Sequence, residues 1–322
     1  MQASADGNLV GELTVRPLVE GTAPGSVSEL LAMQRHVQAV AKRVIPATVA
    51  IRVDQAHGSG VIINPEGYVL TAAHVAGAPH QKARIRLHDG RLVYGTTLGV
   101  FRTKDAGLIK ITTDGSNWPH ASMGNSGGLE GGHWCVATGH PGGFQEGRAP
   151  VLRLGRVLKR ERDAITTDCT LIGGDSGGPL FDMRGQVIGI HSRIGEPLVQ
   201  NLHVPVNAYR TTWDRLVAGE AWGTLPGTEY EPYIGVQGES PAGRIARVED
   251  VLDGSPAEAA GILPGDVIIR FGRRRVTNFE SLINLVLEQE PGRSVSVEVL
   301  RGEEEVRMEI TVGKRLRRTQ QR

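Results

Sequence analysis

Several features that define other protein classes are scarce in this sequence. Only two of its 322 residues are cysteines, Cys135 and Cys169, which is too few for a disulfide framework. We expect two buried free thiols rather than a bond between them. No stretch approaches the ~18 apolar residues that a membrane-spanning helix needs, and aromatic residues make up only 4%.

An excess of charge of one sign is also lacking. Lys and Arg number 36 and Asp and Glu 35, for a net charge of +1, which gives no reason to expect nucleic acid or an anionic membrane as partner. The first 15 residues contain no apolar core flanked by basic residues, so no secretory leader is visible. The compartment therefore stays open: intracellular, or periplasmic or otherwise extracytoplasmic if a leader has been removed.

Glycine, in contrast, is abundant, with 43 residues scattered between short Val, Ile and Leu runs. This pattern predicts many strands joined by tight turns. No helical pattern of ten residues separates the runs, which argues against parallel βαβ units. Two sets of six strands suggest two small barrels in one domain. The first set covers 48–53, 60–63, 68–71, 84–87, 92–100 and 108–111; the second covers 134–138, 151–158, 164–167, 180–181, 186–191 and 201–204.

The flanking segments complete the predicted organisation. Residues 1–25 show no period and are expected to be loose. Residues 26–217 form the barrel domain, beginning with a helix that Ser26 and Glu29 cap and Pro46 stops. A linker is expected at 218–227, a small α+β module at 228–314, and a solvated basic tail at 315–322. The module's longer helix is expected to open at Thr277, with Glu280 at capping-box spacing, and to end before Pro291.

The strongest chemical signal is the segment Gly173-Gly174-Asp175-Ser176-Gly177-Gly178-Pro179. A serine hydroxyl becomes a useful nucleophile when it is exposed at a turn near a base and near donors for an oxyanion. The flanking glycines allow a sharp turn, and the N–H groups of Gly174 and Ser176 are the natural oxyanion hole. The alternative is a glycine-rich hairpin loop with an incidental serine.

Two further residues fit a catalytic triad. His74 follows the apolar run 68–70, where a strand ends, and Asp105 precedes the run 108–111. Alone, each has an ordinary explanation, because histidines are often structural and aspartate often forms turns. The order His, Asp, Ser matches the chymotrypsin type rather than the subtilisin or α/β-hydrolase type. With His74 and Asp105 in the first barrel and Ser176 in the second, the three would meet between barrels.

Two other patterns are set aside. Ser126 lies in a similar Gly-Asn-Ser-Gly-Gly segment, but no strand follows it directly, so we interpret it as a turn between the barrels. His133, Cys135 and His140 match no zinc-binding spacing, and we expect no metal and no cofactor.

Together these motifs resemble the HtrA (Deg) family of trypsin-like serine proteases with one PDZ domain. The stretches that match the family are residues 45–51, 58–63, 67–75, 105–111, 167–168 and 185–190. The resemblance covers about residues 35–314 and implies a mainly β fold, with a chymotrypsin-like double β-barrel followed by a small α+β PDZ domain. It also implies His74 as base, Asp105 as its orienting carboxylate, Ser176 as nucleophile, and Gly174 with Ser176 as oxyanion hole.

The resemblance extends to the C-terminal module. Tyr233, Ile234, Gly235 and Val236 stand where a PDZ domain binds a terminal carboxylate, and a peptide would add as a strand beside a helix that carries Phe279 and Ile283. The implied function is a serine endopeptidase, trimeric like its relatives, that degrades unfolded or damaged polypeptides with exposed C-termini. The alternatives are a catalytically silent adaptor or holdase on the same fold and, more weakly, an esterase.

The sequence departs from the family in one place. Asp175 stands where relatives usually have Asn, as in trypsin-like enzymes whose carboxylate pairs with a newly freed N-terminal ammonium. No Ile-Val-Gly-Gly activation segment exists here, so the partner of Asp175 stays open. The substrate pocket is expected to be apolar, because the three residues directly before the serine loop, Thr170, Leu171 and Ile172, offer no carboxylate; Ile190 and His191 are its other candidate residues.

Overall fold

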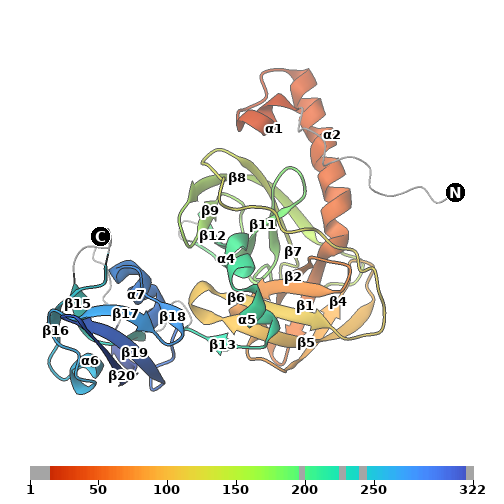
Figure 1. The fold of residues 1–322 in the computed structure, drawn as a ribbon. Coiled ribbons are helices and arrows are strands. Elements are labelled where there is room, and N and C mark those ends of the chain that lie inside the picture. The colour runs from red at the N-terminus through yellow and green to blue at the C-terminus, as the bar shows by residue number, and fades with distance from the viewer. Residues whose placement is uncertain (1–14, 196–199, 225–229, 239–244, 317–322) are drawn as a thin grey trace. The chain divides into compact units, whose positions relative to one another are not determined.

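The computed structural model describes residues 15–195, 200–224, 230–238 and 245–316. The chain divides into two compact units, Met1–Ala221 and Trp222–Arg322 (Figure 1). Parts of the expected N-terminal segment, linker and basic tail (residues 1–14, 225–229 and 317–322) lie outside the described residues. Among the residues described, no helix has both the length and the apolar character needed to cross a membrane.

The first barrel consists of six antiparallel strands in the order β5-β4-β1-β2-β3-β6, and pairing of β5 with β6 closes it. Inward-facing β-branched side chains such as Val49, Ile85 and Ile109 are fully buried and form its core. All six strands lie where the sequence predicts them, at β1 Thr48–Val53, β2 Ala56–Ile62, β3 Tyr68–Ala72, β4 Lys82–Arg86, β5 Leu92–Phe101 and β6 Ala106–Ile111.

The second barrel is closed by six strands in the order β10-β11-β12-β9-β8-β7. Its core includes Ile165, Leu180 and both cysteines, which are buried and free. The preference for free thiols is thus confirmed. These six strands also match the prediction, at β7 Trp134–Gly139, β8 Val151–Arg160, β9 Ile165–Thr167, β10 Pro179–Phe181, β11 Val187–Arg193 and β12 Asn201–Pro205.

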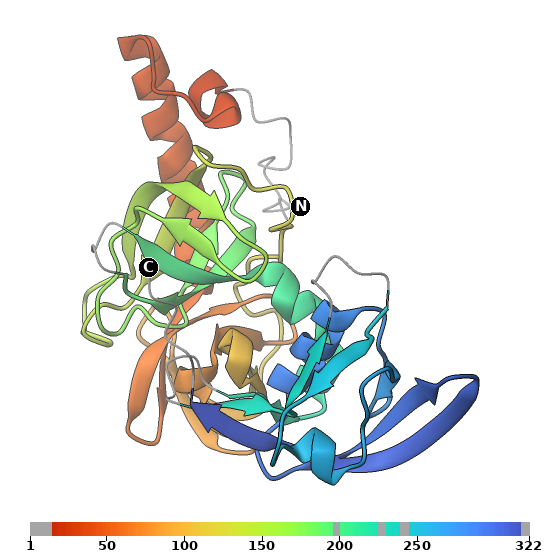
Figure 2. The same cartoon turned by 90° about the vertical axis from the view of Figure 1, so that its left-hand side faces the viewer.

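Two helices precede the barrels. The long helix α2 (Val27–Val44) begins where the sequence predicts, with the Ser26 hydroxyl accepting from the Glu29 N–H at 3.1 Å. Its C-terminal half is buried through Val40 and Val44, and its N-terminal half projects from the barrels in both views (Figures 1 and 2). The expectation of a loose segment up to residue 25 is wrong in part, because α1 (Arg16–Glu20) forms there and ends at a left-handed Gly21.

After the second barrel the chain forms two short helices, α4 (Val206–Thr211) and α5 (Trp213–Val217). The two-residue strand β13 (Ala221–Trp222) then extends the first sheet beyond β5. The expected linker therefore contains a short strand, and directly before it the Glu220 carbonyl accepts a backbone hydrogen bond from Val100.

The second unit is a small α+β module built around a four-stranded sheet in the order β18-β17-β19-β20. Helix α7 (Phe279–Leu287) packs Leu282, Leu285 and Val286 into its core. The capping pair predicted for this helix is wrong: Asn278 and Ser281 bond reciprocally, in place of Thr277 and Glu280. The other elements are β14 Tyr230–Tyr233, β15 Val236–Gly238, β16 Val248–Val251, α6 Pro256–Ala259, β17 Val267–Phe271, β18 Arg274–Arg275, β19 Ser294–Arg301, β20 Glu304–Thr311 and β21 Gly313–Leu316.

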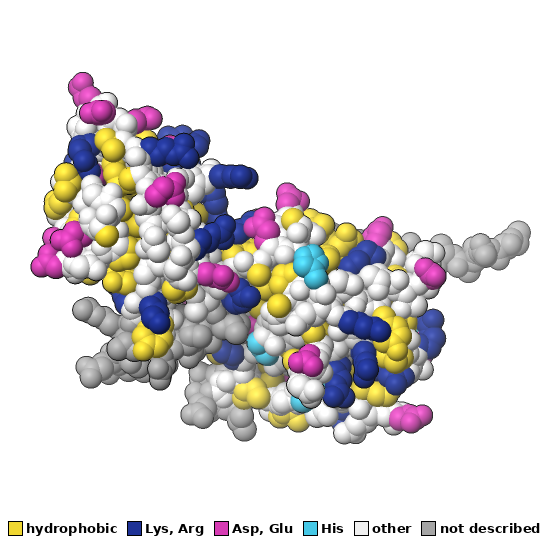
Figure 3. Space-filling view, turned by 90° about the horizontal axis from the view of Figure 1, so that it is seen from below, with side chains coloured by type: hydrophobic (Ala, Val, Ile, Leu, Met, Phe, Trp, Pro, Cys, Tyr) yellow, Lys and Arg dark blue, Asp and Glu magenta, His cyan; other side chains and the backbone are white. Residues whose placement is uncertain are grey.

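The surface charge reflects the balanced composition. On the face drawn in Figure 3, Lys and Arg side chains are interspersed with Asp and Glu, and hydrophobic side chains lie between them. This face therefore presents no large area of a single sign.

Candidate active site

His74 and Asp105 meet because the strands that carry them are neighbours. Strand β3 pairs with β6, with Ala72 opposite Ala106. His74 follows β3 in the four-residue helix α3 (Ala73–Ala76), and Asp105 precedes β6 with a left-handed φ of 56°. The pairing of two adjacent strands thus fixes the distance between the imidazole and the carboxylate.

The contact between the two side chains is close and two-sided. His74 Nδ1 lies 3.0 Å from both Asp105 Oδ1 and Oδ2, and the His74 backbone N–H donates to Oδ1 at 3.1 Å. Asp105 is buried, whereas 39% of the His74 side chain is exposed. A carboxylate that accepts from Nδ1–H leaves Nε2 as the basic nitrogen on the exposed side of the ring. The pair therefore has the arrangement that a general base needs.

A third group that the sequence analysis missed completes the carboxylate's environment. Ser192 in β11 donates its hydroxyl to Asp105 Oδ2 at 2.6 Å, and this hydrogen bond joins the second barrel to the first. A serine at the end of a strand carries no local signal for this role, because only the packing of the two barrels brings it to Asp105.

The serine loop is held against the first barrel by Ser59 of β2. The Ser59 N–H donates to the Ser176 carbonyl at 2.7 Å, and the Ser59 hydroxyl donates to the Gly174 carbonyl at 2.8 Å. Gly177, at φ +83°, lies so close to Thr71 Oγ1 and the Ser59 carbonyl oxygen that a side chain there would overlap them, and the Ala72 nitrogen is the next nearest atom. The loop that carries Ser176 therefore lies against the end of β3, immediately before His74.

The predicted oxyanion donors are oriented by a backbone contact. The Gly142 N–H donates to the Gly173 carbonyl at 2.7 Å. Because C=O and N–H point in opposite directions across a trans peptide, the Gly174 N–H faces away from that contact. No residue in the described parts of the chain accepts a hydrogen bond from the Gly174 N–H or from the Ser176 N–H. Both donors are thus available to a ligand.

The candidate substrate-pocket residues divide into two groups. Thr170 and Ile172 reach the solvent, whereas Leu171, Ile190 and His191 are buried in the second barrel. Thr170 and Ile172 carry no charge, which is consistent with an apolar substrate pocket; that pocket stays a prediction.

His191 belongs to a chain of buried hydrogen bonds. Its Nε2 lies 3.1 Å from the Thr138 carbonyl, its Nδ1 lies 2.9 Å from His203 Nδ1, and His203 Nε2 lies 2.7 Å from the Thr167 hydroxyl. Burial lowers the pKa of His191 well below 6.5 and that of His203 to about 3. Since a carbonyl only accepts, His191 must donate from Nε2 and accept from His203, so both tautomers are defined by the network.

Two residues of the patterns set aside on sequence grounds, Ser126 and His140, are buried. Ser126 is buried, and its hydroxyl accepts from the Asn207 N–H at 3.2 Å while its own N–H donates to Asn207 Oδ1. His140 is buried as well, and burial lowers its pKa to about 4. Throughout the described ranges, no group of three or more His, Cys, Asp or Glu side chains is placed to hold a metal.

In the second unit, the predicted carboxylate-binding segment forms a tight turn. Gly235 has φ +86°, and a Cβ there would overlap Ser255, so only glycine fits. The Ile234 carbonyl accepts from the Ala257 N–H, and the Gly235 carbonyl accepts from the Leu252 N–H. No residue in the described ranges accepts from the N–H groups of Ile234 and Gly235. The turn thus presents two free donors.

The helix predicted to line a peptide groove has both a buried and an exposed candidate residue. Phe279 is buried against Gly238 of β15, which shows that the start of α7 and β15 lie side by side. Ile283, one turn later, is 44% exposed. Tyr233 and Val236 are half-buried.

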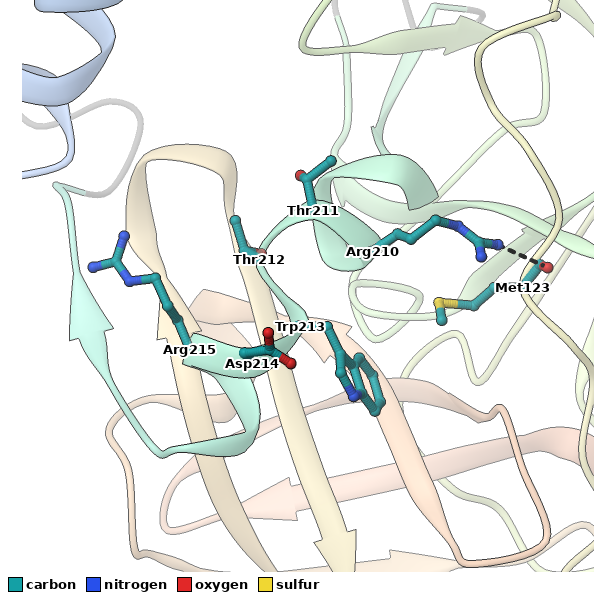
Figure 4. A pocket seen from close by; sticks show the side chains of 7 residues that line it. All are labelled: Met123, Arg210, Thr211, Thr212, Trp213, Asp214 and Arg215. Carbon is teal, nitrogen blue, oxygen red and sulfur yellow. Dashed lines mark hydrogen bonds between the residues drawn. The ribbon is translucent and has the colours of Figure 1, made fainter. Parts of the chain in front are cut away.

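A hollow of about 480 Å³ lies elsewhere, at helices α4 and α5 (Figure 4). Met123 and residues 210–215 line it, and the Arg210 guanidinium donates to the Met123 carbonyl. None of the predicted catalytic or peptide-binding residues lines it, so it is separate from the site described above.

Comparison with known proteins adds independent evidence. Residues 58–190 match the trypsin-like peptidase domain, and residues 232–312 match the PDZ domain. The chain is 31% identical over 272 residues to a probable periplasmic serine endoprotease, DegP-like, of Hahella chejuensis, covering 80% of this chain and 57% of that relative. It is 32% identical over 283 residues to the putative serine protease HhoA of Synechocystis, covering 79% of this chain and 69% of the relative.

Solved structures agree. The HtrA-type protease AlgW with a tripeptide superimposes with a TM-score of 0.58 at 26% identity, over 87% of this chain and 97% of AlgW. The serine endoprotease from Yersinia pestis gives 0.59 at 25% identity, over 91% and 99%. The chain thus combines a double β-barrel of the chymotrypsin type with one PDZ domain, and it belongs to the HtrA family of serine proteases.

Proposed function

We propose that the chain is a serine endopeptidase in which Ser176 is the nucleophile, His74 the general base and Asp105 the carboxylate that orients it. The observation that supports this most directly is the 3.0 Å contact of His74 Nδ1 with both oxygens of a buried carboxylate. The contact leaves Nε2 free of the carboxylate, and the loop that carries Ser176 lies against Ser59 and the end of β3, the strand that precedes His74.

The reaction follows from these positions. The Ser176 hydroxyl oxygen attacks a peptide carbonyl while His74 Nε2 takes the hydroxyl proton, and the N–H groups of Gly174 and Ser176 stabilise the oxyanion. The imidazolium then gives its proton to the leaving amine, which departs and leaves an acyl-enzyme that water hydrolyses by the same route. General-base catalysis contributes roughly 10²–10⁴-fold, and one oxyanion donor on the order of 10²–10³-fold.

The PDZ unit is proposed to bind the C-terminal carboxylate of a polypeptide. Support comes from the free N–H groups at Ile234 and Gly235 and from the exposed Ile283, which offers an apolar contact to a peptide strand beside α7. Fluorescence anisotropy with an apolar peptide measures this. We expect binding with a free C-terminus, about tenfold weaker binding after Ile283→Lys, and none with an amidated C-terminus.

The proposed substrates are unfolded or damaged polypeptides outside the cytoplasm, cut by a homotrimer. The support is family membership and the description of two relatives as periplasmic endoproteases. The uncharged residues Thr170 and Ile172 ahead of the serine loop favour cleavage after small or medium aliphatic residues. A peptide-library digest dominated by cuts after Lys or Arg would reject that specificity.

Casein digestion by the wild type and by Ser176→Ala tests the enzymatic proposal. We expect the wild type to degrade casein and to react with a fluorophosphonate at Ser176, and the variant to do neither. Identical product profiles would instead support a silent adaptor or holdase. Turnover of a fluorogenic ester without any peptide cleavage would support an esterase.

A further inference from the structure

A buried carboxylate lies within the serine loop itself. Asp175 stands between Gly174 and Ser176, the two residues whose N–H groups are the proposed oxyanion donors, and its side chain is fully buried. A displacement of Asp175 would therefore displace both donors, because they are its direct chain neighbours.

The partner of this carboxylate is Arg153 of strand β8. The guanidinium lies 2.9 Å from Asp175 Oδ2 through one nitrogen and 3.2 Å from Oδ1 through another, and 19% of the Arg153 side chain is exposed. The Ile172 N–H also donates to Oδ2 at 3.0 Å, while the Asp175 N–H donates back to the Ile172 carbonyl at 3.0 Å. The two-pronged ion pair and the reciprocal bonds fix both ends of Asp175.

The surroundings leave room for the carboxylate and for little else. A Cβ on Gly139 of β7, the strand beside β8, would fall 2.5 Å from Asp175 Oδ1 and 3.3 Å from its Cα. Burial raises the pKa of Asp175, whereas the Ile172 N–H and the positive charges of Arg153 and Arg148 act against that increase. A buried carboxylate without its cation would be strongly unfavourable.

We propose that Arg153 is the positioning residue of the oxyanion loop: by binding Asp175 it holds the N–H groups of Gly174 and Ser176 in their catalytic orientation. This inference rests on the proposed peptidase function. Arg153 supplies from a barrel strand the positive charge that activated trypsin-like enzymes take from a freed N-terminus, so the loop needs no cleavage to assemble. Asn, the usual residue of the family at position 175, is neutral and would need no such cation.

Five variants test this role: Arg153→Ala, Arg153→Lys, Asp175→Asn, the double variant Arg153→Ala with Asp175→Asn, and Arg160→Ala as control. Arg160 is an exposed arginine on the same strand. On a peptide substrate, we expect Arg153→Ala to lower kcat by about 100-fold with KM changed less than about threefold, since one oxyanion donor is worth 10²–10³-fold. Arg153→Lys should be intermediate, and Arg160→Ala should stay within about twofold of wild type.

The double variant separates positioning from general stability. If Arg153 acts only through the charge of Asp175, the double variant and Asp175→Asn should have the same kcat within about threefold. This comparison holds even if Arg153→Ala alone fails to fold, because neither protein contains the buried carboxylate without its cation, and the Arg153 side chain that stays in Asp175→Asn is partly exposed to water. A double variant more than tenfold less active than Asp175→Asn would overturn the proposal.

Hydrogen exchange measures the loop without relying on activity. Peptides spanning residues 170–179 should exchange about tenfold faster in Arg153→Lys than in wild type, and peptides from the first barrel should be unchanged. Unchanged exchange in the loop would overturn the positioning role, whatever the activity. A wild type with no Ser176-dependent cleavage, but with the expected exchange pattern, would instead refute the peptidase proposal alone.

Discussion

Replacement of Gly177 by alanine tests whether the serine loop is held against the first barrel. Gly177 has φ +83°, and an added Cβ would overlap Thr71 Oγ1 and the Ser59 carbonyl oxygen and lie 3.0 Å from the Ala72 nitrogen. The left-handed conformation costs alanine about 1–2 kcal/mol, and overpacking against fixed backbone adds about 1–3 kcal/mol.

Gly90 provides the matched control. It lies in the hairpin between β4 and β5 with nearly the same φ, +86°, but a Cβ there would meet nothing within 4 Å. Gly90→Ala therefore carries the cost of the backbone conformation alone. The difference between the two variants isolates the steric clash, which we expect to be about 1–3 kcal/mol.

Thermal unfolding and active-site labelling measure the two consequences. The protease-domain transition of Gly177→Ala should lie about 2–12 °C below that of Gly90→Ala, because 1 kcal/mol shifts Tm by about 2–4 °C for a domain of this size. Fluorophosphonate labelling per folded molecule should fall about 100-fold in Gly177→Ala and stay within twofold in Gly90→Ala. Equal Tm values together with equal labelling rates would refute the contact between the loop and β3.

Three further outcomes are expected. Ser192→Ala removes the 2.6 Å hydrogen bond to Asp105; it should lower kcat/KM by roughly tenfold with little change in KM, and an unchanged kcat/KM would show that water replaces the hydroxyl. Unfolding free energy should decrease as pH falls below 6.5, because the buried histidines stay neutral in the fold while the unfolded chain binds protons; His203, with its pKa lowered to about 3, contributes about 2 kcal/mol of the loss at pH 5, and His203→Gln should remove that part in denaturant titrations. Cys135 and Cys169, with sulfurs 3.9 Å apart and both buried, should resist a thiol reagent in the native protein and react fully in denaturant; rapid native labelling would contradict their burial.

The strands of both barrels are predictable from the sequence because each is a short apolar run bounded by turn residues. In β4, buried Ile85 lies between the exposed Arg84 and the half-buried Arg86, so the two-residue period is visible there. Strands β1 and β6 are buried along most of their length, and they are recognised as continuous apolar runs instead. Helix α1 is missed because its five residues contain too few apolar positions to show a period, and only Pro17 and Gly21 at its ends mark it. The cap of α7 falls on Asn278 rather than Thr277, since two adjacent residues are both good caps and local sequence does not choose between them.

The active site divides in the same way. His74 and Asp105 are predicted because each follows or precedes a recognisable strand and because the chain order His, Asp, Ser matches the chymotrypsin type. The sequence does not reveal the roles of Ser59, Ser192 and Arg153, because these roles depend on tertiary contacts. The two serines make contacts between the barrels, with residues 87 to 117 positions away in the chain. Arg153 makes its contact within the second barrel, with a residue 22 positions away. Sequence pattern thus predicts the proposed reacting groups, whereas tertiary packing selects the residues that contact and orient them.

Asp105 holds both the backbone and the side chain of the segment that carries His74. Its carbonyl accepts from the Ala73 N–H at 3.1 Å, while its carboxylate accepts from the backbone and the ring of His74. One residue therefore anchors the main chain and the imidazole together, within a single pair of hydrogen-bonded strands. Loop movements that preserve the pairing of β3 with β6 and the Ser192 hydrogen bond would therefore leave the spacing between the imidazole and the carboxylate unchanged.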